Sequence, residues 1–343
     1  MIVEALRIVV ERRDLDSATA EAVMTEIMEG QATPAQVAAF ITALRMKGET
    51  TDEIAAFVKV MRSKVQPVVS KVHPEVLDTC GTGGDSSGTF NISTAVAFVA
   101  AGAGVPVAKH GNRSVSSRCG SADVLRELGV NIEARPEIVA RCLDEAGICF
   151  IFAPLFHPAM KHAIGPRREI GIRTVFNLLG PLTNPAGASC QLLGVYDRAL
   201  TVRLAEVLGK LESRKAYVVH GHGGLDEIAL SGPSDAACLE NGHVRRISID
   251  PAALGIPVQP AETVRGGEAA ENAALIHRVL EGGKGPQRDI VLLNAAAAIS
   301  AFHDGMDIAG GLEAARRSLD SGAAGAKLEQ LIRLSHQEGS VTQ

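Results

Sequence analysis

The feature that most constrains the fold of this chain is a change of pattern near residue 74. Before this point, apolar residues recur at helical spacing and no strand pattern is present. After it, short apolar runs typical of strands alternate with helical stretches, at 75–79, 105–109, 148–152, 190–196 and 215–220. Such alternation predicts a mainly parallel sheet covered by helices. We therefore expect an α/β fold, with a small all-helical N-terminal domain ahead of a large α/β domain.

The helical N-terminal domain is predicted to span 1–66. Asp16-Ser17 can cap its second helix, Thr33-Pro34 its third, and Thr51 begins a fourth. Because so small a domain cannot bury all of its helical surface alone, we expect a homodimer that joins through these helices.

The large α/β domain is predicted to span 74–343. An Asn241-Gly242 pair is typical of the tight turn of a hairpin. The C-terminal part returns to helices, at 268–281 and 287–336. We also expect a segment near 165–185 to pack with the helical domain.

Composition and charge exclude several classes of protein. The chain has 343 residues, 46% of them hydrophobic and 21% charged, so a large core can form. A formal net charge of -5 argues against nonspecific nucleic-acid binding, which needs a basic surface. The six cysteines form no Cys-x-x-Cys pair and residues 1–16 hold no apolar signal core, so we expect reduced thiols in a cytoplasmic protein. The apolar runs are too broken to span a membrane.

A glycine-rich stretch follows the first predicted strand. Gly81, Gly83 and Gly84 can take positive φ and let the backbone approach a ligand closely. Asn91 and Ser93 can start the helix behind them. Unpaired N–H groups at a helix start beside a glycine turn favour an anion such as phosphate. The stretch is neither a Walker loop nor a dinucleotide fingerprint, and a plain strand-to-helix turn is the alternative.

Basic and hydroxyl side chains follow the second predicted strand. Lys109, His110 and Arg113 stand beside Asn112 and several serines. This density of donors suits phosphates and ribose hydroxyls. Polar loops at strand ends are also common as plain solvent-exposed connections.

An acidic pair, Asp226-Glu227, follows the fifth predicted strand. Adjacent carboxylates in such a loop suit a hard cation that keeps several waters. Acidic pairs are also frequent on protein surfaces, and that interpretation stays open on these two residues alone.

In order and at close spacing, these motifs resemble the anthranilate phosphoribosyltransferase family. The segments that carry the resemblance are Gly81-Thr82-Gly83-Gly84-Asp85, Asn91-Ile92-Ser93-Thr94, Lys109-His110-Gly111-Asn112-Arg113, His157-Pro158-Ala159-Met160-Lys161, 173–185, His220-Gly221 and Gly224-Leu225-Asp226-Glu227. The likeness covers nearly the whole chain, and the motifs are specific together although each is weak alone.

The resemblance implies a reaction with two substrates. The amine of anthranilate displaces pyrophosphate from phosphoribosyl pyrophosphate (PRPP), with Mg²⁺ as cofactor, to give N-(5-phosphoribosyl)anthranilate in tryptophan biosynthesis. Cleavage of the anomeric C–O bond builds negative charge on the leaving pyrophosphate, so stabilising that group is the main catalytic lever. An aryl amine needs little deprotonation before attack, and we expect no strong general base. The resemblance also implies a homodimer, whereas association with anthranilate synthase leaves no signal in the sequence.

The resemblance distributes the site residues between the two substrates. Those implied to bind PRPP are Gly81, Gly84, Asp85, Thr89, Asn91, Ile92, Ser93, Thr94, Lys109, Gly111, Asn112, Arg113, Ser114, Ser116, Ser117 and Ser121. Those implied to bind anthranilate are Gly81, Asn112, His157, Arg167 and Gly180. The implied metal ligands are Ser93, Asp226 and Glu227, and the implied catalytic residues are Lys109, His110, Asp226 and Glu227.

Two of these assignments carry a condition. Arg167 is implied to hold the anthranilate carboxylate, which suits the planar guanidinium, and Gly165-Pro166 just before it is expected to alter the local helix. His110 could assist the reaction or serve as a structural hydrogen-bonding group.

Two other functions compete with this interpretation. A pyrimidine nucleoside phosphorylase of related fold carries a loop like that at 109–113, and Gly120-Ser121-Ala122-Asp123 fits it too. The Asp226-Glu227 pair and the segment 177–184 argue against a metal-free phosphorolysis. A non-catalytic homologue that binds a polyanion is the other alternative, and the net charge of -5 argues against it.

Overall fold

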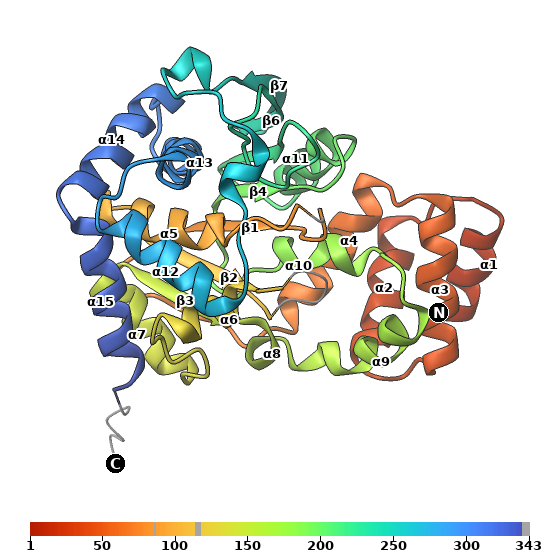
Figure 1. Ribbon diagram of the computed structural model, residues 1–343. Coiled ribbons are helices and arrows are strands. Elements are labelled where there is room, and N and C mark those ends of the chain that lie inside the picture. Colours follow the sequence, from red (N-terminus) through yellow and green to blue (C-terminus); the bar gives the residue numbers. More distant parts are fainter. Residues whose placement is uncertain (86, 114–117, 338–343) are drawn as a thin grey trace.

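Seven strands form one sheet in the computed structural model, which describes residues 1–85, 87–113 and 118–337 (Figure 1). Their order is β3-β2-β1-β4-β5-β6-β7. The strands are β1 Leu77–Gly81, β2 Val107–Gly111, β3 Ile148–Phe152, β4 Cys190–Gly194, β5 Lys215–His220, β6 Ser234–Glu240 and β7 His243–Ile249. The first five pair in parallel, and β6 and β7 add an antiparallel hairpin. The predicted class, α/β with a mainly parallel sheet, is therefore confirmed.

Two strands lie later in the chain than their apolar runs predict. Expected at 75–79 and 105–109, β1 and β2 end instead at Gly81 and Gly111. Glycine is unfavourable in strands, but ladder pairing overrides that preference here. Gly81 pairs with Gly194, and Gly111 with Phe152.

Four helices make the N-terminal part, and local capping explains where they begin. They are α1 Ile2–Val10, α2 Ser17–Met28, α3 Pro34–Lys47 and α4 Thr51–Ser63. Asp16 accepts a hydrogen bond from the Thr19 N–H at 2.7 Å, as an N-cap residue should. Thr33 and Thr50 each form a capping box with the residue three positions on. The expected helix starts at 17, 34 and 51 are confirmed.

The remaining helices cover the sheet or connect its strands. They are α5 Ile92–Gly102, α6 Ser121–Glu127, α7 Pro136–Ala146, α8 Ala153–Phe156, α9 Lys161–Ile170, α10 Phe176–Leu182, α11 Leu200–Lys210, α12 Ala269–Leu280, α13 Pro286–Phe302, α14 Ile308–Asp320 and α15 Ala323–Ser335. Short 3₁₀ turns lie at Pro158–Met160, Ala252–Leu254 and Ala261–Val264. The segment 153–167 after β3 is thus largely helical, and α9 contains Pro166 in its interior.

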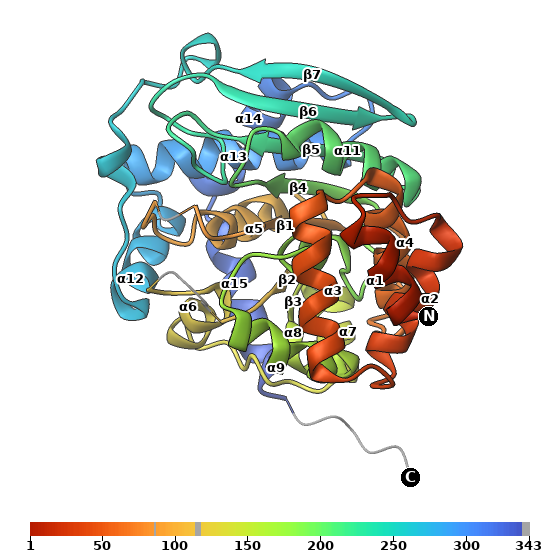
Figure 2. The same ribbon diagram turned by 90° about the vertical axis from the view of Figure 1, so that its right-hand side faces the viewer.

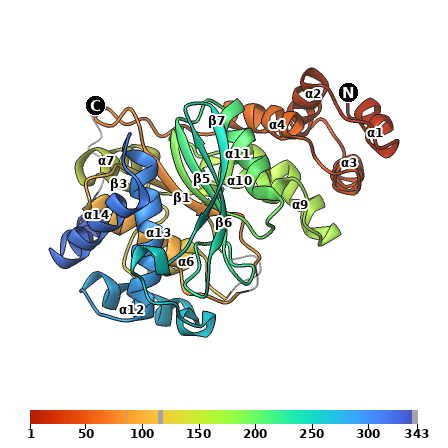
Figure 3. The same cartoon turned by 90° about the horizontal axis from the view of Figure 1, so that it is seen from above.

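Alternate residues of the strands feed two separate hydrophobic clusters. Leu192 packs in the cluster with α5, α13 and α15, and its neighbour Leu193 packs in the other. This second cluster joins α1–α4 with α10 and α11, and it includes Ala163 of α9 and Phe176 of α10. Figure 3 shows the sheet between these two layers, and Figure 2 shows α1–α4 gathered at one side of it. The helical part is thus continuous with one face of the sheet.

Two expectations from composition concern cysteines and membranes. All six cysteines are buried and none forms a disulfide. In the described ranges, every helix is too short or too polar to cross a lipid bilayer.

Candidate active site

The chain order of the strands brings three loops to one point of the sheet. From β1 the chain continues to β2 on one side, while β4 lies on the other side of β1. In such sheets ligands bind at the carboxyl ends of the strands where the winding reverses. The loops after β1, β2 and β5 carry most of the residues singled out in the sequence, and hydrogen bonds join these residues to one another.

The loop after β1 is a glycine turn closed by carboxylates. Gly83 and Gly84 have φ of 66° and 76°, which favour glycine. Gly81 does not share this conformation, contrary to the expectation, and its need is spatial: a Cβ there would lie 2.9 Å from Asp226 Oδ2. The Gly83 N–H donates to Asp226 Oδ2 at 2.9 Å, and the Asp226 N–H donates to Asp85 Oδ2 at 3.3 Å. The glycine loop and the acidic pair therefore form one unit.

The acidic pair itself lies beside the start of α5, with Glu227 buried and Asp226 half-buried. Glu227 Oε1 accepts the Ser93 N–H at 3.1 Å. Burial and then repulsion from Asp226 raise the pKa of Glu227 to about 8. Burial and repulsion from Asp85 raise the pKa of Asp226 to about 7. Crowded carboxylates with raised pKa values are a site where a cation would be stabilising.

The protein side chains alone would not complete the coordination of that cation, and water and substrate oxygens would supply the other ligands. In the described part of the chain, no three His, Cys, Asp or Glu side chains are grouped to hold a metal ion by themselves. Mg²⁺ usually keeps waters and takes substrate phosphate oxygens beside one or two carboxylates. Asp226 and Glu227, with Ser93 next to Glu227, fit that kind of incomplete site.

Lys109 lies beneath the glycine loop rather than at its surface. Its side chain is buried, and Nζ donates to the Thr79 carbonyl at 2.5 Å and to Ser93 Oγ at 3.3 Å. Burial lowers its pKa, and the charges of Asp78 and Glu227 oppose that shift. Lys109 is thus a buried cation close enough to Asp78 and Glu227 to interact with their charges.

The first residues of α5 carry the predicted phosphate contacts. Asn91 stands at the N-cap, but its side chain does not cap its own helix. The Ile92 N–H donates to the Phe90 carbonyl at 2.7 Å. The Thr94 hydroxyl is buried without a hydrogen-bond partner among the described residues. Thr89 forms an isolated antiparallel bridge with Arg265.

Behind β2, Gly111 and Ser121 lie in close contact. A Cβ at Gly111 would collide with Ser121 Oγ and would lie 2.8 Å from the Phe150 ring, so only glycine fits. The Ser121 hydroxyl donates to the Asn112 carbonyl at 3.3 Å. Arg113 is held away from this contact, 3.6 Å from Glu133 and over the Phe152 ring. The predicted residues Ser114, Ser116 and Ser117 lie outside the described residues.

Two buried histidines join this side of the site to the segment after β3. The Nε2 atoms of His110 and His157 lie 3.0 Å apart. Burial lowers the pKa of His110 to about 3 and that of His157 to about 4, so both rings are neutral near pH 7. His110 also bonds the Gly180 carbonyl. These contacts bring together three of the residues that the sequence assigned to the aromatic substrate or to catalysis.

Arg167 is a half-buried cation with no anionic partner in the described structure. Its guanidinium lies 5.1 Å from the centroid of the Phe176 ring. Burial alone lowers its pKa. No described carboxylate lies within ion-pair distance of Arg167, so an acidic ligand that entered beside Phe176 would find a cation ready. Pro166 is itself buried within α9, just ahead of this arginine.

Three polar contacts at this site had no signal in the sequence. Arg173 donates to the Gly84 carbonyl and stacks over the Tyr196 ring at 4.2 Å. Buried Gln191 of β4 donates to the Pro181 carbonyl at 2.6 Å. Arg62 of α4 donates to the Leu182 carbonyl at 2.9 Å. With His110 on Gly180, successive carbonyls at the end of α10 are held from different elements. Of these residues, Gln191 alone has a local sign of a buried polar contact, because it is a single polar residue within an apolar strand.

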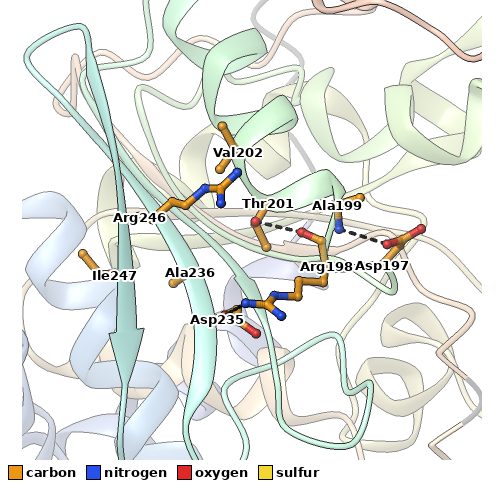
Figure 4. A pocket seen from close by; sticks show the side chains of 9 residues that line it. All are labelled: Asp197, Arg198, Ala199, Thr201, Val202, Asp235, Ala236, Arg246 and Ile247. Atoms are coloured by element: carbon orange, nitrogen blue, oxygen red, sulfur yellow. Dashed lines mark hydrogen bonds and ion pairs between the residues drawn. The ribbon is translucent and has the colours of Figure 1, made fainter.

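A surface pocket of about 400 Å³ lies elsewhere, between the start of α11 and the β6–β7 hairpin (Figure 4). Arg198 forms an ion pair there with Asp235 at 2.9 Å. The lining residues are Asp197, Arg198, Ala199, Thr201, Val202, Asp235, Ala236, Arg246 and Ile247. None of them belongs to the predicted site, so we assign the chemistry to the loops at the carboxyl edge.

Known proteins match nearly the whole length of this chain. Residues 73–325 match the family model described as "Glycosyl transferase family, a/b domain", and 3–65 match its helical bundle domain. The anthranilate phosphoribosyltransferase of Moorella thermoacetica is 57% identical over 94% of this chain and 95% of its own. The crystal structure of that enzyme from Thermus thermophilus superposes with a TM-score of 0.92, at 42% identity, over 97% of this chain and 99% of its own. The Saccharomyces cerevisiae enzyme in complex with PRPP and Mg gives a TM-score of 0.88 at 27% identity, over 97% of both chains. The chain therefore belongs to the anthranilate phosphoribosyltransferase family.

Proposed function

We propose that the carboxyl edge of the sheet is where this chain transfers the phosphoribosyl group of PRPP to the amine of anthranilate. The proposal rests on two separate charged centres of opposite sign. The carboxylates of Asp226 and Glu227 stand at the glycine loop, and the cation of Arg167, which has no acidic partner among the described residues, stands on α9. A polyphosphate with its metal suits the first centre, and an aromatic carboxylate suits the second.

PRPP is assigned to the loops after β1 and β2. Gly83 and Gly84 have positive φ, and nothing lies within 4 Å of the place where a Cβ of Gly83 would stand, so a phosphate can approach there. The start of α5 adds a favourable dipole. Asn91, Asn112 and Ser121 bring polar groups to the same place. Lys109 is buried beside Ser93, where its positive charge stabilises the ionised acidic pair and the leaving pyrophosphate.

Mg²⁺ is assigned to Asp226 and Glu227, with Ser93 beside them. The ion supplies charge neutralisation for the leaving pyrophosphate. The chain's own residues prepare that step: the Ser93 N–H fixes the Glu227 carboxylate, and the Gly83 N–H fixes that of Asp226. The yeast relative solved with PRPP and Mg supports this assignment.

Anthranilate is assigned to the space bounded by Arg167, His157 and the Gly180 turn. Arg167 would bind the carboxylate, and the neighbouring Phe176 ring offers an apolar surface. A hydrogen bond from His110 to the Gly180 carbonyl places this turn beside the histidine pair. The neutral histidine pair can accept or donate a hydrogen bond but is a weak base, which agrees with a nucleophile that needs little deprotonation.

The chain is further proposed to act as a homodimer through the helices of 1–66. Val3, Val10 and Met46 are apolar and exposed there, at 48%, 59% and 72%. A second copy of the chain is the occupant that such a face favours, because helical hairpins pack well on themselves. The family match leaves the nucleoside phosphorylase and the polyanion-binding alternatives without support.

A fluorescence assay tests the proposed function directly. Purified protein, anthranilate and PRPP should consume anthranilate fluorescence and form N-(5-phosphoribosyl)anthranilate in the presence of Mg²⁺. Reactions with EDTA, and reactions with thymidine and phosphate in place of the two substrates, serve as controls. Formation of thymine, or full activity in EDTA, would overturn the assignment.

A further inference from the structure

A buried amide on α12 reaches the start of α5. Asn272 is 1% exposed, and its Nδ2 donates to Asn91 Oδ1 at 3.0 Å. Its own Oδ1 accepts the Gly267 N–H at 2.8 Å. Figure 1 shows α12 beside α5 and α6, although no sequence motif assigned α12 a role at the site. The side chain thus links a C-terminal helix to the glycine-loop helix.

The same amide belongs to a closed set of hydrogen bonds. Asn91 Nδ2 donates to the Cys119 carbonyl at 3.2 Å. The Cys119 thiol, whose pKa burial raises to about 11, is also hydrogen-bonded by the Asn272 side chain. Asn91 precedes α5, and Cys119 precedes Ser121 at the start of α6. Asn272 therefore ties together two loops that meet at the sheet edge.

This network explains why Asn91 does not cap its own helix. An N-cap asparagine ordinarily accepts a hydrogen bond from the second or third helical N–H with its side chain. Here the Asn91 oxygen is taken by Asn272, and its amide nitrogen by Cys119. The orientation of the Asn91 side chain is therefore set by tertiary contacts from α12 and the loop before α6.

Residues 264–268, which lead into α12, pack closely against the loop 88–91 that precedes α5. The Gly266 N–H donates to the Gly88 carbonyl at 2.9 Å, and the Phe90 N–H donates to the Val264 carbonyl at 3.2 Å. A Cβ at Gly266 would lie 2.6 Å from both Phe90 Cα and Asn272 Oδ1, so only glycine fits. Residues 264–266 and Asn272 together hydrogen-bond Gly88, Phe90 and Asn91 of the loop 88–91.

We propose that Asn272 is a positioning residue for PRPP, acting through Asn91 and Cys119 and touching no substrate itself. The inference rests on the proposed function, since it requires that Asn91 and the residues before α6 receive PRPP. With the amide in place, Asn91 and Cys119 are held in position before the substrate binds. Without it, part of the binding free energy goes into ordering them, so affinity for PRPP falls.

The test compares Asn272→Ala with Asn131→Ala, a control variant that also removes a bridging side-chain amide. Asn131 also bridges distant segments, its Nδ2 donating to the Ser335 carbonyl at 3.1 Å, but it lies away from the site loops. Asn272→Ala should raise the KM for PRPP about tenfold, the effect of losing a hydrogen bond or two, and leave the KM for anthranilate within about twofold. Asn131→Ala should lower Tm and change neither KM. Should Asn272→Ala fail to fold, Asn272→Ser, which keeps a hydroxyl, replaces it.

A double-mutant cycle separates positioning from a general loss of packing. Because Asn272 acts in part through Asn91, Asn91→Ala combined with Asn272→Ala should raise the PRPP KM by less than the product of the two single effects. Multiplied effects, or equal changes in both KM values, would overturn the proposal. Calorimetric binding of PRPP to wild type and to Asn272→Ala gives the same comparison without turnover. A wild-type protein that made no product but lost PRPP affinity on the substitution would contradict the proposed function and not this inference.

Discussion

His110 and His157 face each other through their Nε2 atoms at 3.0 Å, so one ring donates and the other accepts. His110 also bonds the Gly180 carbonyl. Since a carbonyl only accepts, the His110 nitrogen that meets it carries a proton. A neutral pair therefore has a proton on one Nε2 atom and an accepting lone pair on the other. The pair has a defined tautomer only while both rings stay neutral.

Acid should therefore destabilise the fold through this pair. Each histidine titrates near pH 6.5 when unfolded, but burial lowers the folded pKa values to about 3 and about 4. Between pH 6.5 and about 4 the unfolded chain binds protons that the folded chain excludes, so the free energy of unfolding falls as pH falls. Buried carboxylates with raised pKa values, such as Glu227, have the opposite effect. Comparing a variant with wild type isolates the histidines.

The variant to use is His157→Gln, whose amide can still donate to His110. Urea unfolding at pH 7 and pH 5 should show a smaller loss of stability in the variant, by up to about 1.4 kcal/mol per pH unit. His336→Gln, at an exposed position distant from the site, is the control and should keep the pH dependence of wild type. Equal pH dependence in wild type and His157→Gln would contradict the burial of His157 as a neutral ring.

A second prediction concerns the acidic pair. Asp226→Asn with Glu227→Gln should abolish most turnover, because the leaving pyrophosphate loses the groups that hold its metal. The fold should survive, since both carboxyl groups have raised pKa values and their ionised forms are costly. Without metal at pH 9, Tm should rise by a few degrees, as removing buried charge repulsion is stabilising.

Binding of the metal can be followed in the same samples. With PRPP present, Mg²⁺ should raise the Tm of wild type and leave that of the double variant unchanged. Asp250→Asn, at a half-buried position just after β7, is a control for lost negative charge. Near wild-type turnover of the double variant at saturating Mg²⁺ would show that the metal binds elsewhere.

Local patterns predicted the parts of the fold that local physics decides. β3 and β5 lie where continuous apolar runs put them, at 148–152 and 215–220. The helix starts at 17 and 34 follow from capping side chains. A local helix was expected around Arg167, but its bounds and the whole of α10 were not, because α9 and α10 each contain glycine and an internal proline. Packing against α2, α3 and α4 stabilises both helices.

Residue types predicted the chemistry of the site, but tertiary contacts decide its geometry. Glycine loops, basic loops and acidic pairs indicate phosphate and metal chemistry in a sequence. Gln191, Arg62 and Asn272 give no such signal, because each is a single polar residue whose partner is 10, 120 or 181 positions away. The contact of buried Lys109 with the Thr79 carbonyl of β1 could not be predicted either. A position at the end of a strand does not show which neighbouring strand a side chain will contact.

A third prediction concerns the homodimer. Val10 and Met46 are exposed on α1 and α3, so Val10→Glu with Met46→Glu should convert a dimer into a monomer by placing charges in an apolar interface. Light scattering after size exclusion at micromolar concentration gives the mass. Val258→Glu, which is exposed far from these helices in the chain, should leave the dimer intact. A wild-type protein that runs only as a monomer would refute the proposal.

The last prediction separates the two substrates. Arg167 has a half-buried guanidinium beside Phe176 and no described acidic partner, whereas its neighbour Arg168 is exposed. A charge-assisted hydrogen bond contributes about 1.5–3 kcal/mol, and about 1.4 kcal/mol corresponds to a factor of ten. Arg167→Ala should therefore raise the anthranilate KM roughly ten- to a hundredfold and change the PRPP KM much less. Arg167→Lys should fall between, because a point charge replaces a planar pair of donors, and Arg168→Ala should resemble wild type. Coupling between the sites would spread each effect to both substrates without reversing their order. If Arg167→Ala weakens PRPP more than anthranilate, the proposed division of the site is wrong.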